Sequence, residues 1–237
     1  MYSFDSRIRY SETDSEGRLT LSALLDYFQD SSTFQAHDVG AGVSFMKQRG
    51  LVWVLNSWQI VPIRFPMFGE HVTIGTFPYE FRKFIGQRNF LMLDDNGEYL
   101  AMANSMWSLI SIDTGKPVNA PQEILVGYRV EEKLPMEYAQ RKIPVREGGT
   151  FLENIPVTRR LLDVNHHVNN GQYVRLAEDF WPDGVTVKQL RAEYKKQAFL
   201  GDVLHPYVTN ENGIFTTIFR DAEGQTYASV EIEYHEK

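Results

Sequence analysis

The chain has 237 residues, of which 43% are hydrophobic, so it can bury one large core or two small ones. Its net charge of −7 argues against a general nucleic-acid binder, which would need a basic face. The absence of cysteine excludes disulfides, thiolate metal sites and a cysteine nucleophile. The start of the chain lacks the apolar segment of a signal peptide, and no apolar run reaches the length of a membrane span. We therefore expect a cytoplasmic protein without membrane insertion.

The first half is predicted to hold a short extended start, one helix and four strands. The helix is indicated by Leu21, Leu24, Leu25 and Phe28, which recur at helical spacing. Runs rich in β-branched and aromatic residues then predict strands at 51–61, 71–81, 85–93 and 100–110. Between the last two, the sequence DDNG is typical of a hairpin turn.

Residues 113–149 hold four of the ten prolines and are predicted to form a linker with one short helix near 121–129.

The second half repeats the plan of the first. Tyr173, Leu176, Ala177 and Phe180 predict a helix that stops before Pro182. Strands are predicted after it, at 185–196, 203–210, 214–220 and 227–236.

The two halves also resemble each other in sequence, which indicates an internal duplication. Matching segments occur in the same order at falling offsets: 14–30 with 163–179 (149 residues), 63–72 with 195–204 (132 residues), and 94–101 with 221–228 (127 residues). The first copy therefore carries 17 extra residues (149 − 132) between its helix and its second strand. One long helix followed by an antiparallel sheet, twice, predicts an α+β fold in which each curved sheet wraps its own helix. We assign residues 1–112 to the first domain, 113–149 to the linker and 150–237 to the second domain.

Polar side chains concentrate at LLDVNHHVNNGQYV, residues 161–174. Asp163, Asn165 and His167 alternate, so an extended or turning segment would aim all three into one pocket while His166 points elsewhere. A carboxylate beside apolar neighbours is a candidate base or nucleophile. Backbone N–H groups at the start of the following helix, near 168–171, could stabilise an oxyanion.

The alternative is a turn with a helix cap, since Asp and Asn commonly form both. The first copy discriminates between these interpretations, because it has Asp14, Glu16 and Arg18 at the equivalent positions. It lacks the Asn and His, which indicates one functional site per chain, in the second half. The adjacent histidines do not predict a metal site, because neighbouring side chains diverge and no further ligand motif accompanies them.

The alternating pattern resembles the Asp-x-Asn-x-His-Val-Asn-Asn signature of the acyl-acyl-carrier-protein (acyl-ACP) thioesterases of plants and bacteria. The layout likewise resembles a tandem hotdog fold, a double helix-and-sheet unit. Further similarity lies at 51–70 and 191–202, so the resemblance runs over nearly the whole chain, least in the linker. The family's Glu-Tyr-Arg-Arg-Glu-Cys segment reads here from Glu193 to Ala198, with Gln197 in place of the second acid. Gln197 could orient water or a side chain but cannot act as a base.

The resemblance implies hydrolysis of fatty acyl-ACP to free fatty acid and carrier, which terminates fatty acid synthesis. It implies no metal and no bound cofactor, although the carrier's phosphopantetheine arm must enter the site. Catalytic roles fall on Asp163, Asn165, His167 and Gln197, and substrate contacts on Asn169 and Asn170. The first half would form the acyl-chain cavity, lined by some of Phe45, Met46, Trp53 and Trp58.

The carrier protein is acidic, so docking needs a local basic face on this acidic chain. The candidates for that face are Arg159, Arg160, Lys188, Lys195 and Lys196. The alternatives are an acyl-CoA thioesterase of the same fold, a non-catalytic acyl-ligand binder, and a hotdog dehydratase, which fits the fold but not the signature. Both a monomer and a homodimer fit the tandem plan.

Overall fold

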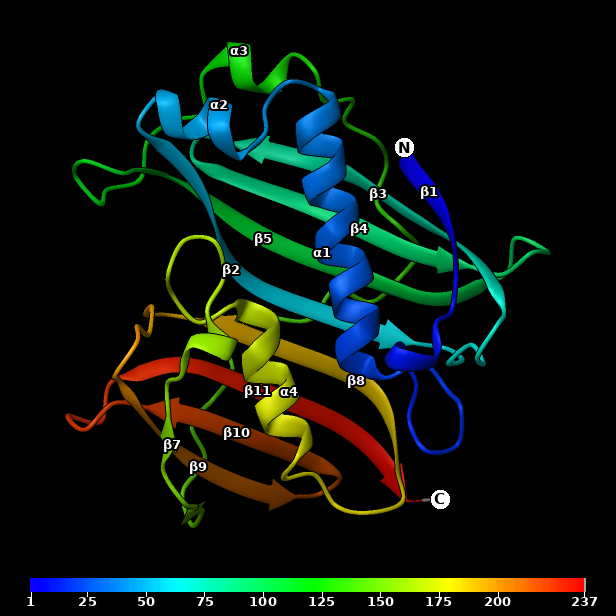
Figure 1. The fold of residues 1–237 in the computed structure, drawn as a ribbon, viewed down its shortest axis with the longest axis vertical. Coiled ribbons are helices and arrows are strands. Elements are labelled where there is room, and N and C mark those ends of the chain that lie inside the picture. The colour runs from blue at the N-terminus through cyan, green and yellow to red at the C-terminus, as the bar shows by residue number, and fades with distance from the viewer. Residues whose placement is uncertain (237) are drawn as a thin grey trace. The chain divides into compact units, whose positions relative to one another are not determined.

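The computed structural model describes residues 1–236 and divides into two compact units. The first comprises residues 1–56 and 60–138, and the second comprises residues 57–59 and the chain from residue 139 onward. Each unit has one long helix packed on an antiparallel sheet (Figure 1). The expected α+β architecture, with a helix-and-sheet unit that occurs twice, is therefore confirmed.

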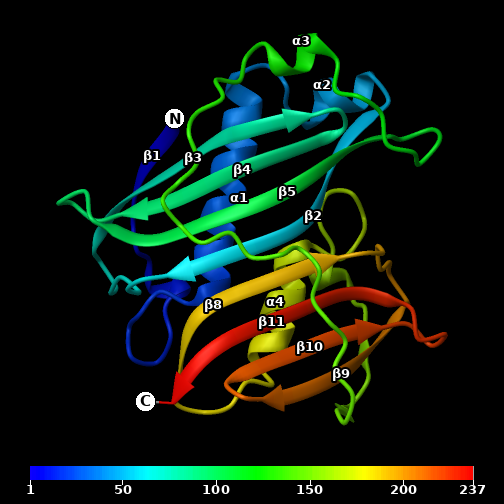
Figure 2. The ribbon, with the colours of Figure 1, turned by 180° about the vertical axis from the view of Figure 1, so that it is seen from behind.

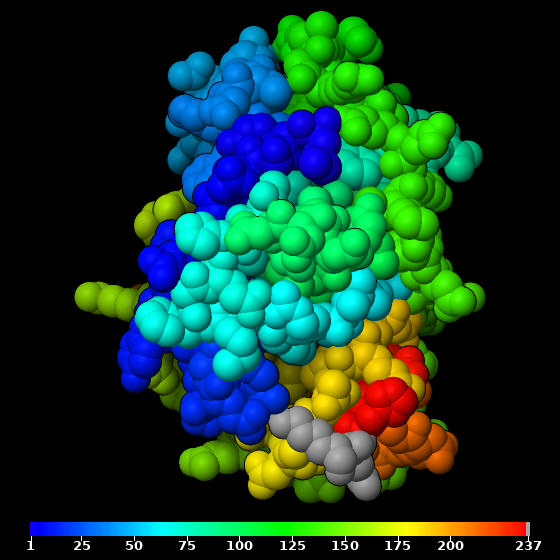
Figure 3. All heavy atoms as spheres, turned by 90° about the vertical axis from the view of Figure 1, so that its right-hand side faces the viewer, coloured from blue at the N-terminus to red at the C-terminus, as the bar shows by residue number. Residues whose placement is uncertain are grey.

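In the first unit the strands follow the order β1-β3-β4-β5-β2, and α1 crosses one face of the sheet (Figure 1). The atoms of the N-terminal strand lie at the surface beside those of its neighbour β3 (Figure 3). The elements are β1 (Tyr2–Arg7), η1 (Tyr10–Glu12), α1 (Leu21–Asp38), α2 (Val43–Gln48), β2 (Leu51–Pro62), β3 (His71–Arg82), β4 (Ile85–Leu93), β5 (Tyr99–Ser111) and α3 (Gln122–Leu125).

Helix α1 forms because its apolar residues share one face and a polar residue caps its start. Leu24, Leu25 and Phe28 are at most 1% exposed. The Phe28 ring centre lies 5.6 Å from that of Phe90 in β4, which packs the helix against the sheet. At the N-terminus, Thr20 Oγ1 accepts the backbone N–H of residue 23 at 3.2 Å. The predicted helical spacing is confirmed.

In the second unit the order is β8-β11-β10-β9-β6, with β7 also paired to β9. The elements are β6 (Thr150–Phe151), β7 (Ile155–Pro156), η2 (Arg159–Leu161), α4 (Asn170–Glu178), β8 (Val185–Tyr194), β9 (Val203–Glu211), β10 (Ile214–Arg220) and β11 (Thr226–Glu236). Helix α4 ends two residues before Phe180, the last residue of the predicted pattern. The Phe180 N–H instead reaches the Ala177 carbonyl at 3.0 Å, an i→i−3 bond that tightens the chain into a turn ahead of Pro182.

Each unit has the same set of internal backbone hydrogen bonds, and the residue numbers of equivalent bonds differ by the offsets found in the sequence. This correspondence confirms the duplication. The bonds link the turn before each long helix, the helix start and the strand that follows. The matched donor–acceptor pairs are Ile8 to Glu70 and Val157 to Asp202, Gly17 to Asp14 and His166 to Asp163, Leu19 to Pro66 and Val168 to Ala198, and Gly97 to Asp94 and Gly224 to Asp221. Each pair differs by the offset of its own segment, so both copies fold around the same scaffold.

The linker is not a loose tether, because both of its halves are hydrogen-bonded to a sheet. In the first unit, the fully buried Asn89 accepts the Leu134 N–H at 3.2 Å and the Tyr138 hydroxyl at 2.8 Å. In the second unit, Glu193 accepts the Ile143 N–H at 3.2 Å. Figure 2 shows the chain after α3 crossing the sheet face opposite α1, and residues 139–149 crossing the face opposite α4. We call residues 139–149 the strap.

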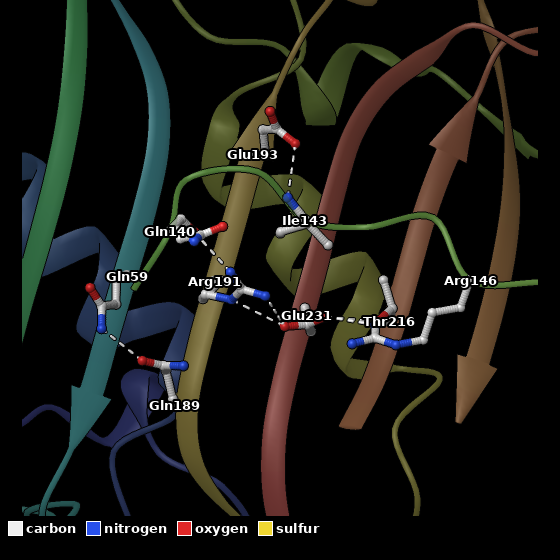
Figure 4. A network of polar contacts seen from close by, with 9 residues as sticks. All are labelled: Gln59, Gln140, Ile143, Arg146, Gln189, Arg191, Glu193, Thr216 and Glu231. Atoms are coloured by element: carbon white, nitrogen blue, oxygen red, sulfur yellow. Dashed lines mark hydrogen bonds and ion pairs between the residues drawn. The ribbon is translucent and has the colours of Figure 1, made fainter. Parts of the chain in front are cut away.

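A charged cluster fastens the strap to the second sheet (Figure 4). The Glu231 carboxylate, on β11, accepts hydrogen bonds from Arg146 of the strap at 2.7 Å and from Arg191 of β8 at 2.5 and 3.1 Å. The Glu231 side chain is only 6% exposed, whereas those of Arg146 and Arg191 are 20% and 15% exposed. Because one buried carboxylate holds two guanidinium groups, its loss would leave both cations without their counter-charge.

We predict that Glu231→Ala lowers the free energy of unfolding by about 3–5 kcal/mol, the usual cost of removing one member of a buried ion pair. The matched control is Glu233→Ala on the same strand, whose partner is the exposed Lys188 at 3.2 Å. That change should cost at most about 1 kcal/mol. Urea unfolding followed by circular dichroism measures both, and equal losses would contradict the role given to Glu231.

Candidate active site

Residues 163–167 form a tight turn that closes on itself before α4. The Asp163 N–H donates to the His167 carbonyl at 2.9 Å, and Leu162 forms a β-bridge with Val168 on either side of the turn. His166 sits in the left-handed region at φ +63°, where the first copy has Gly17 at φ +77°. This turn, rather than simple alternation along a strand, exposes the His166 side chain while His167 is 17% exposed.

The turn brings together the three side chains singled out in the sequence. Asp163 Oδ2 lies 3.7 Å from His167 Nδ1 and 3.5 Å from Asn165 Nδ2. The Asp163 side chain is 19% exposed, so most of it is shielded from solvent. His167 Nδ1 also lies 3.3 Å from the Val168 carbonyl oxygen. A carboxylate, an amide and an imidazole thus share one small site.

The Asp163 side chain also stabilises the turn in which it lies. Its Oδ1 accepts the Asn165 N–H at 2.8 Å, which is the bond of an Asx turn. In the first copy, Asp14 Oδ1 accepts the Glu16 and Arg18 N–H groups, both at 2.9 Å. The side-chain oxygen at this position therefore stabilises the turn in both copies.

The copies differ in what faces the second carboxylate oxygen. Arg18 binds Asp14 Oδ2 through Nε and Nη2, both at 3.1 Å. Burial by itself would raise the pKa of Asp14, but the backbone N–H groups of Arg18 and Glu16 and the Arg18 guanidinium outweigh it and hold that pKa below its usual range. In the second copy the corresponding oxygen faces His167 and Asn165 instead of an arginine. The two copies are therefore distinguished by the residues that face the aspartate, Asn165 and His167 in the second copy, and not by the aspartate itself.

The start of α4 offers fewer backbone donors than the sequence suggested. The Val168 N–H bonds to the Ala198 carbonyl at 2.8 Å and the Asn169 N–H to the Leu161 carbonyl at 2.9 Å. The Asn169 side chain caps the helix, since its Oδ1 accepts the Gly171 N–H at 2.8 Å. Within the stretch 168–171, which the structure describes in full, only the Asn170 N–H lacks an acceptor. Asn170 is thus the remaining candidate for the oxyanion donor in that stretch.

Gln197 lies at the edge of this site without bonding to it. Its side chain is exposed in the turn after β8, and among residues 1–236 it has no hydrogen bond to the three side chains. Its neighbours do border the site, because Ala198 accepts the Val168 N–H and Phe199 forms a β-bridge with His167. The water-orienting role of Gln197 stays a prediction.

Of the two tryptophans assigned to the acyl cavity, Trp58 is a core residue and Trp53 is partly buried against the core. Trp53 packs on the cluster of Met46, Leu109 and Ile124, to which Phe45 also contributes, and its ring centre lies 6.2 Å from that of Phe81. Trp58 is 2% exposed. Whether these aromatic side chains also contact an acyl chain stays a prediction.

Of the five basic residues proposed for docking, three have carboxylate partners within the chain. Lys196 contacts Asp221 at 2.5 Å, Lys188 contacts Glu233 at 3.2 Å and Lys195 contacts Glu193 at 3.4 Å. Arg159 and Arg160, in the short helix just before the turn, are exposed and have no carboxylate partner among residues 1–236. These two arginines are the free cations nearest to the candidate site in sequence.

Solved structures define the class of fold. The chain superposes with a TM-score of 0.90 on an acyl-ACP thioesterase from Bacteroides thetaiotaomicron, 20% identical, over 98% of this chain and 97% of that one. The 12:0-ACP thioesterase from Umbellularia californica gives 0.87 at 21% identity, over 100% and 98% of the two chains. At these identities the likeness concerns the fold, which is a tandem hotdog.

The family follows from the sequence. The acyl-ACP thioesterase N-terminal domain model matches residues 1–128 and the C-terminal domain model matches residues 146–236. The chain therefore belongs to the acyl-ACP thioesterase family.

Curated relatives include an acyl-[acyl-carrier-protein] hydrolase, FATB3, chloroplastic, of Cuphea viscosissima, 25% identical over 97% of this chain and 61% of the relative. The palmitoyl-acyl carrier protein thioesterase, chloroplastic, of Cuphea hookeriana is 28% identical over 67% of this chain and 41% of its own length. The chain thus spans about three-fifths or less of these relatives.

Three further observations concern cellular location, membrane-spanning helices and metal ligands. Both relatives are named as chloroplastic, so the cytoplasmic location stays a prediction. No helix in the described part of the chain is long and apolar enough to cross a membrane. Across residues 1–236, no group of three or more His, Asp or Glu side chains is arranged to hold a metal ion.

The left-handed backbone at His166 yields a prediction about the turn. His166→Gly should change the free energy of unfolding by less than about 1 kcal/mol, because relief of the left-handed strain roughly offsets the greater freedom of glycine in the unfolded chain. His166→Val should lose more than about 1 kcal/mol, since a β-branched residue resists positive φ. Thermal and urea unfolding compare the two, and equal stability would contradict this account of the turn.

Proposed function

We propose that this chain hydrolyses fatty acyl-ACP to a free fatty acid and the carrier. The observation that carries the proposal is the Asp163 carboxylate, whose Oδ2 faces Asn165 and His167 in one copy, while the matching oxygen of Asp14 is neutralised by arginine. Support comes from the family of the chain and from relatives named as acyl-ACP hydrolases or thioesterases. The geometry offers a proton acceptor or nucleophile, polar groups that position it, and a backbone donor.

In the reaction, Asp163 acts on the thioester carbonyl by one of two routes. As a base, it takes a proton from water while the water oxygen adds to the carbonyl carbon. As a nucleophile, it adds through Oδ2 to give an acyl anhydride, which water then hydrolyses. Either route passes through an oxyanion that the Asn170 N–H could stabilise, and collapse breaks the C–S bond. In the first route the departing thiolate takes the proton that Asp163 removed from water. In the second route the water that hydrolyses the anhydride supplies that proton, so in both routes water and thioester become acid and thiol.

Arg159 and Arg160 provide the docking surface in this proposal. They are exposed, lack an internal carboxylate partner among residues 1–236, and precede Asp163 by only a few residues. An acidic carrier protein, or the phosphate of its phosphopantetheine arm, is attracted to such a pair. Lys188, Lys195 and Lys196 contribute less, because their charges are already balanced by Glu233, Glu193 and Asp221.

The acyl chain would occupy the first half of the chain, where Trp53 packs on the apolar cluster of Met46, Leu109 and Ile124 and Trp58 is buried. Trp58→Ala should shift the preferred acyl chain length, because removal of a large side chain deepens an apolar pocket. A panel of acyl-ACP substrates of increasing length measures the profile. An unchanged profile in a folded variant would exclude Trp58 from the pocket.

The role of Asp163 is tested by two conservative changes at equivalent positions. Asparagine keeps the Oδ1 that accepts the turn N–H but cannot act as a base or carry the negative charge. We therefore expect Asp163→Asn to retain less than about 1% of wild-type kcat, in line with the loss of an essential base or nucleophile. Asp14→Asn should retain most of the activity. Fatty acid release from acyl-ACP measures both, and substantial activity in Asp163→Asn would refute the assignment.

Docking is tested by salt dependence. For the double variant Arg159→Ala/Arg160→Ala, kcat/KM on acyl-ACP should fall about tenfold at low ionic strength and depend less on salt, because exposed charges act over a Debye length of about 10 Å at 0.1 M. Lys188→Ala is the matched control and should change little. The same acyl chain on CoA distinguishes the carrier from a smaller phosphorylated thioester. A wild-type rate independent of salt would contradict the docking surface.

A further inference from the structure

Tyr194 differs between the copies in the same way as the residues of the candidate site. It ends β8, and at the offset of 132 residues its counterpart in the first copy is Pro62, which has no hydroxyl to donate. The sequence drew attention to the Glu193–Ala198 segment because of Gln197, and gave no separate role to this tyrosine. Its contact with α4 appears only in the tertiary structure.

The Tyr194 hydroxyl donates to the Asn170 carbonyl at 3.0 Å. The N–H of the same peptide group, which belongs to Gly171, donates to Asn169 Oδ1 at 2.8 Å. The peptide between residues 170 and 171 is therefore held at both ends by side chains. In the first copy the cap lies one peptide further on, since Thr20 accepts the residue 23 N–H, and no side chain among residues 1–236 bonds to the Leu21 carbonyl.

The fixed peptide adjoins the one backbone donor of residues 168–171 that has no acceptor. The Asn170 N–H lies on the preceding peptide, whose Asn169 carbonyl accepts the Gln172 N–H at 2.9 Å. The direction of the Asn170 N–H is set by ψ of residue 169 and φ of residue 170. Clamping the 170–171 peptide limits those torsions, so it holds the N–H at a constant angle to the Asp163 turn. Precise aim matters for an oxyanion donor, because small displacements weaken its bond to the developing charge.

The surroundings of Tyr194 keep its hydroxyl protonated, so that it can donate a hydrogen bond. Burial raises the pKa of Tyr194, and the nearby Tyr173 raises it further, so the phenol stays protonated throughout the working pH range. The rings of Tyr173 and Tyr194 lie 6.1 Å apart, which fixes the side chain in place. The Tyr173 hydroxyl itself is buried and has no hydrogen-bond partner in the described part of the chain.

We infer that Tyr194 is a positioning residue for thioester hydrolysis: by holding the Asn170 carbonyl, it aims the Asn170 N–H at the oxyanion. This inference rests on the proposed function. It assigns Tyr194 an effect on the transition state rather than on substrate binding. A residue with this role should affect kcat and leave KM nearly unchanged.

The test compares Tyr194→Phe with Tyr173→Phe on acyl-ACP. Both remove one buried phenolic oxygen, but only the first removes a hydrogen bond. We expect kcat of Tyr194→Phe to fall about 10- to 100-fold, less than the roughly 100- to 1,000-fold lost when an oxyanion donor itself is removed, with KM changed less than about threefold. Tyr173→Phe should keep wild-type kcat. Equal kcat in the two variants, or a loss confined to KM, would overturn the inference.

A second variant keeps the test decisive if Tyr194→Phe folds poorly. Asn169→Ala frees the same peptide from its N–H side, so by itself it should show the same kcat-selective loss. Where Tyr194→Phe folds, the double variant should lose less than the product of the single losses. If the loss in kcat of the double variant equals the product of the two single losses, the two side chains do not act through the same peptide, and the inference is overturned. Failure of the proposed function is distinguishable, since wild type would then release no fatty acid at all.

Discussion

The second unit depends on one interaction, the Asx turn in which a carboxylate accepts a backbone N–H two residues on. Asp163 makes this bond before α4, and Asp14 makes it before α1. The turn reverses the chain tightly enough to seat the helix start against the strand that follows. Because the bond uses only Oδ1, the other oxygen is free to take a different partner in each copy. The turn thus places a side-chain acceptor, an aspartate in each case, at the same position twice.

The two copies differ in the partners of the second carboxylate oxygen, Oδ2 of Asp14 or Asp163. Arg18 closes a charge-assisted bond to Asp14 and leaves nothing for a substrate. The nearest atoms of His167 and Asn165 lie 3.7 and 3.5 Å from Asp163 Oδ2, too far for strong hydrogen bonds. The duplication therefore supplies an internal control: the same turn, with and without the groups that chemistry would need.

The end of β8 links the two faces of the second sheet, because successive side chains of a strand point to opposite sides. Glu193 faces the strap and accepts the Ile143 N–H, whereas Tyr194 faces α4 and donates to the Asn170 carbonyl. The carboxylate of Glu231 further anchors the strap through two arginines. The linker and the site are thereby attached to the same strand, which makes the linker part of the domain it crosses.

Local sequence determined helices α1 and α4, the main strands and the duplication, because helical spacing, β-rich runs and turn motifs depend on near neighbours. It also placed Asp163, Asn165 and His167 together, since all three lie within one turn. It did not predict α2 (Val43–Gln48), which lies in the extra residues of the first copy. Tertiary structure decided the rest: that Asn169 is committed to the cap, that Arg159 and Arg160 keep free charges while the lysines do not, and that Tyr194 reaches the helix start. Those outcomes require contacts between residues distant in sequence, and no local pattern encodes which donor meets which acceptor across a fold.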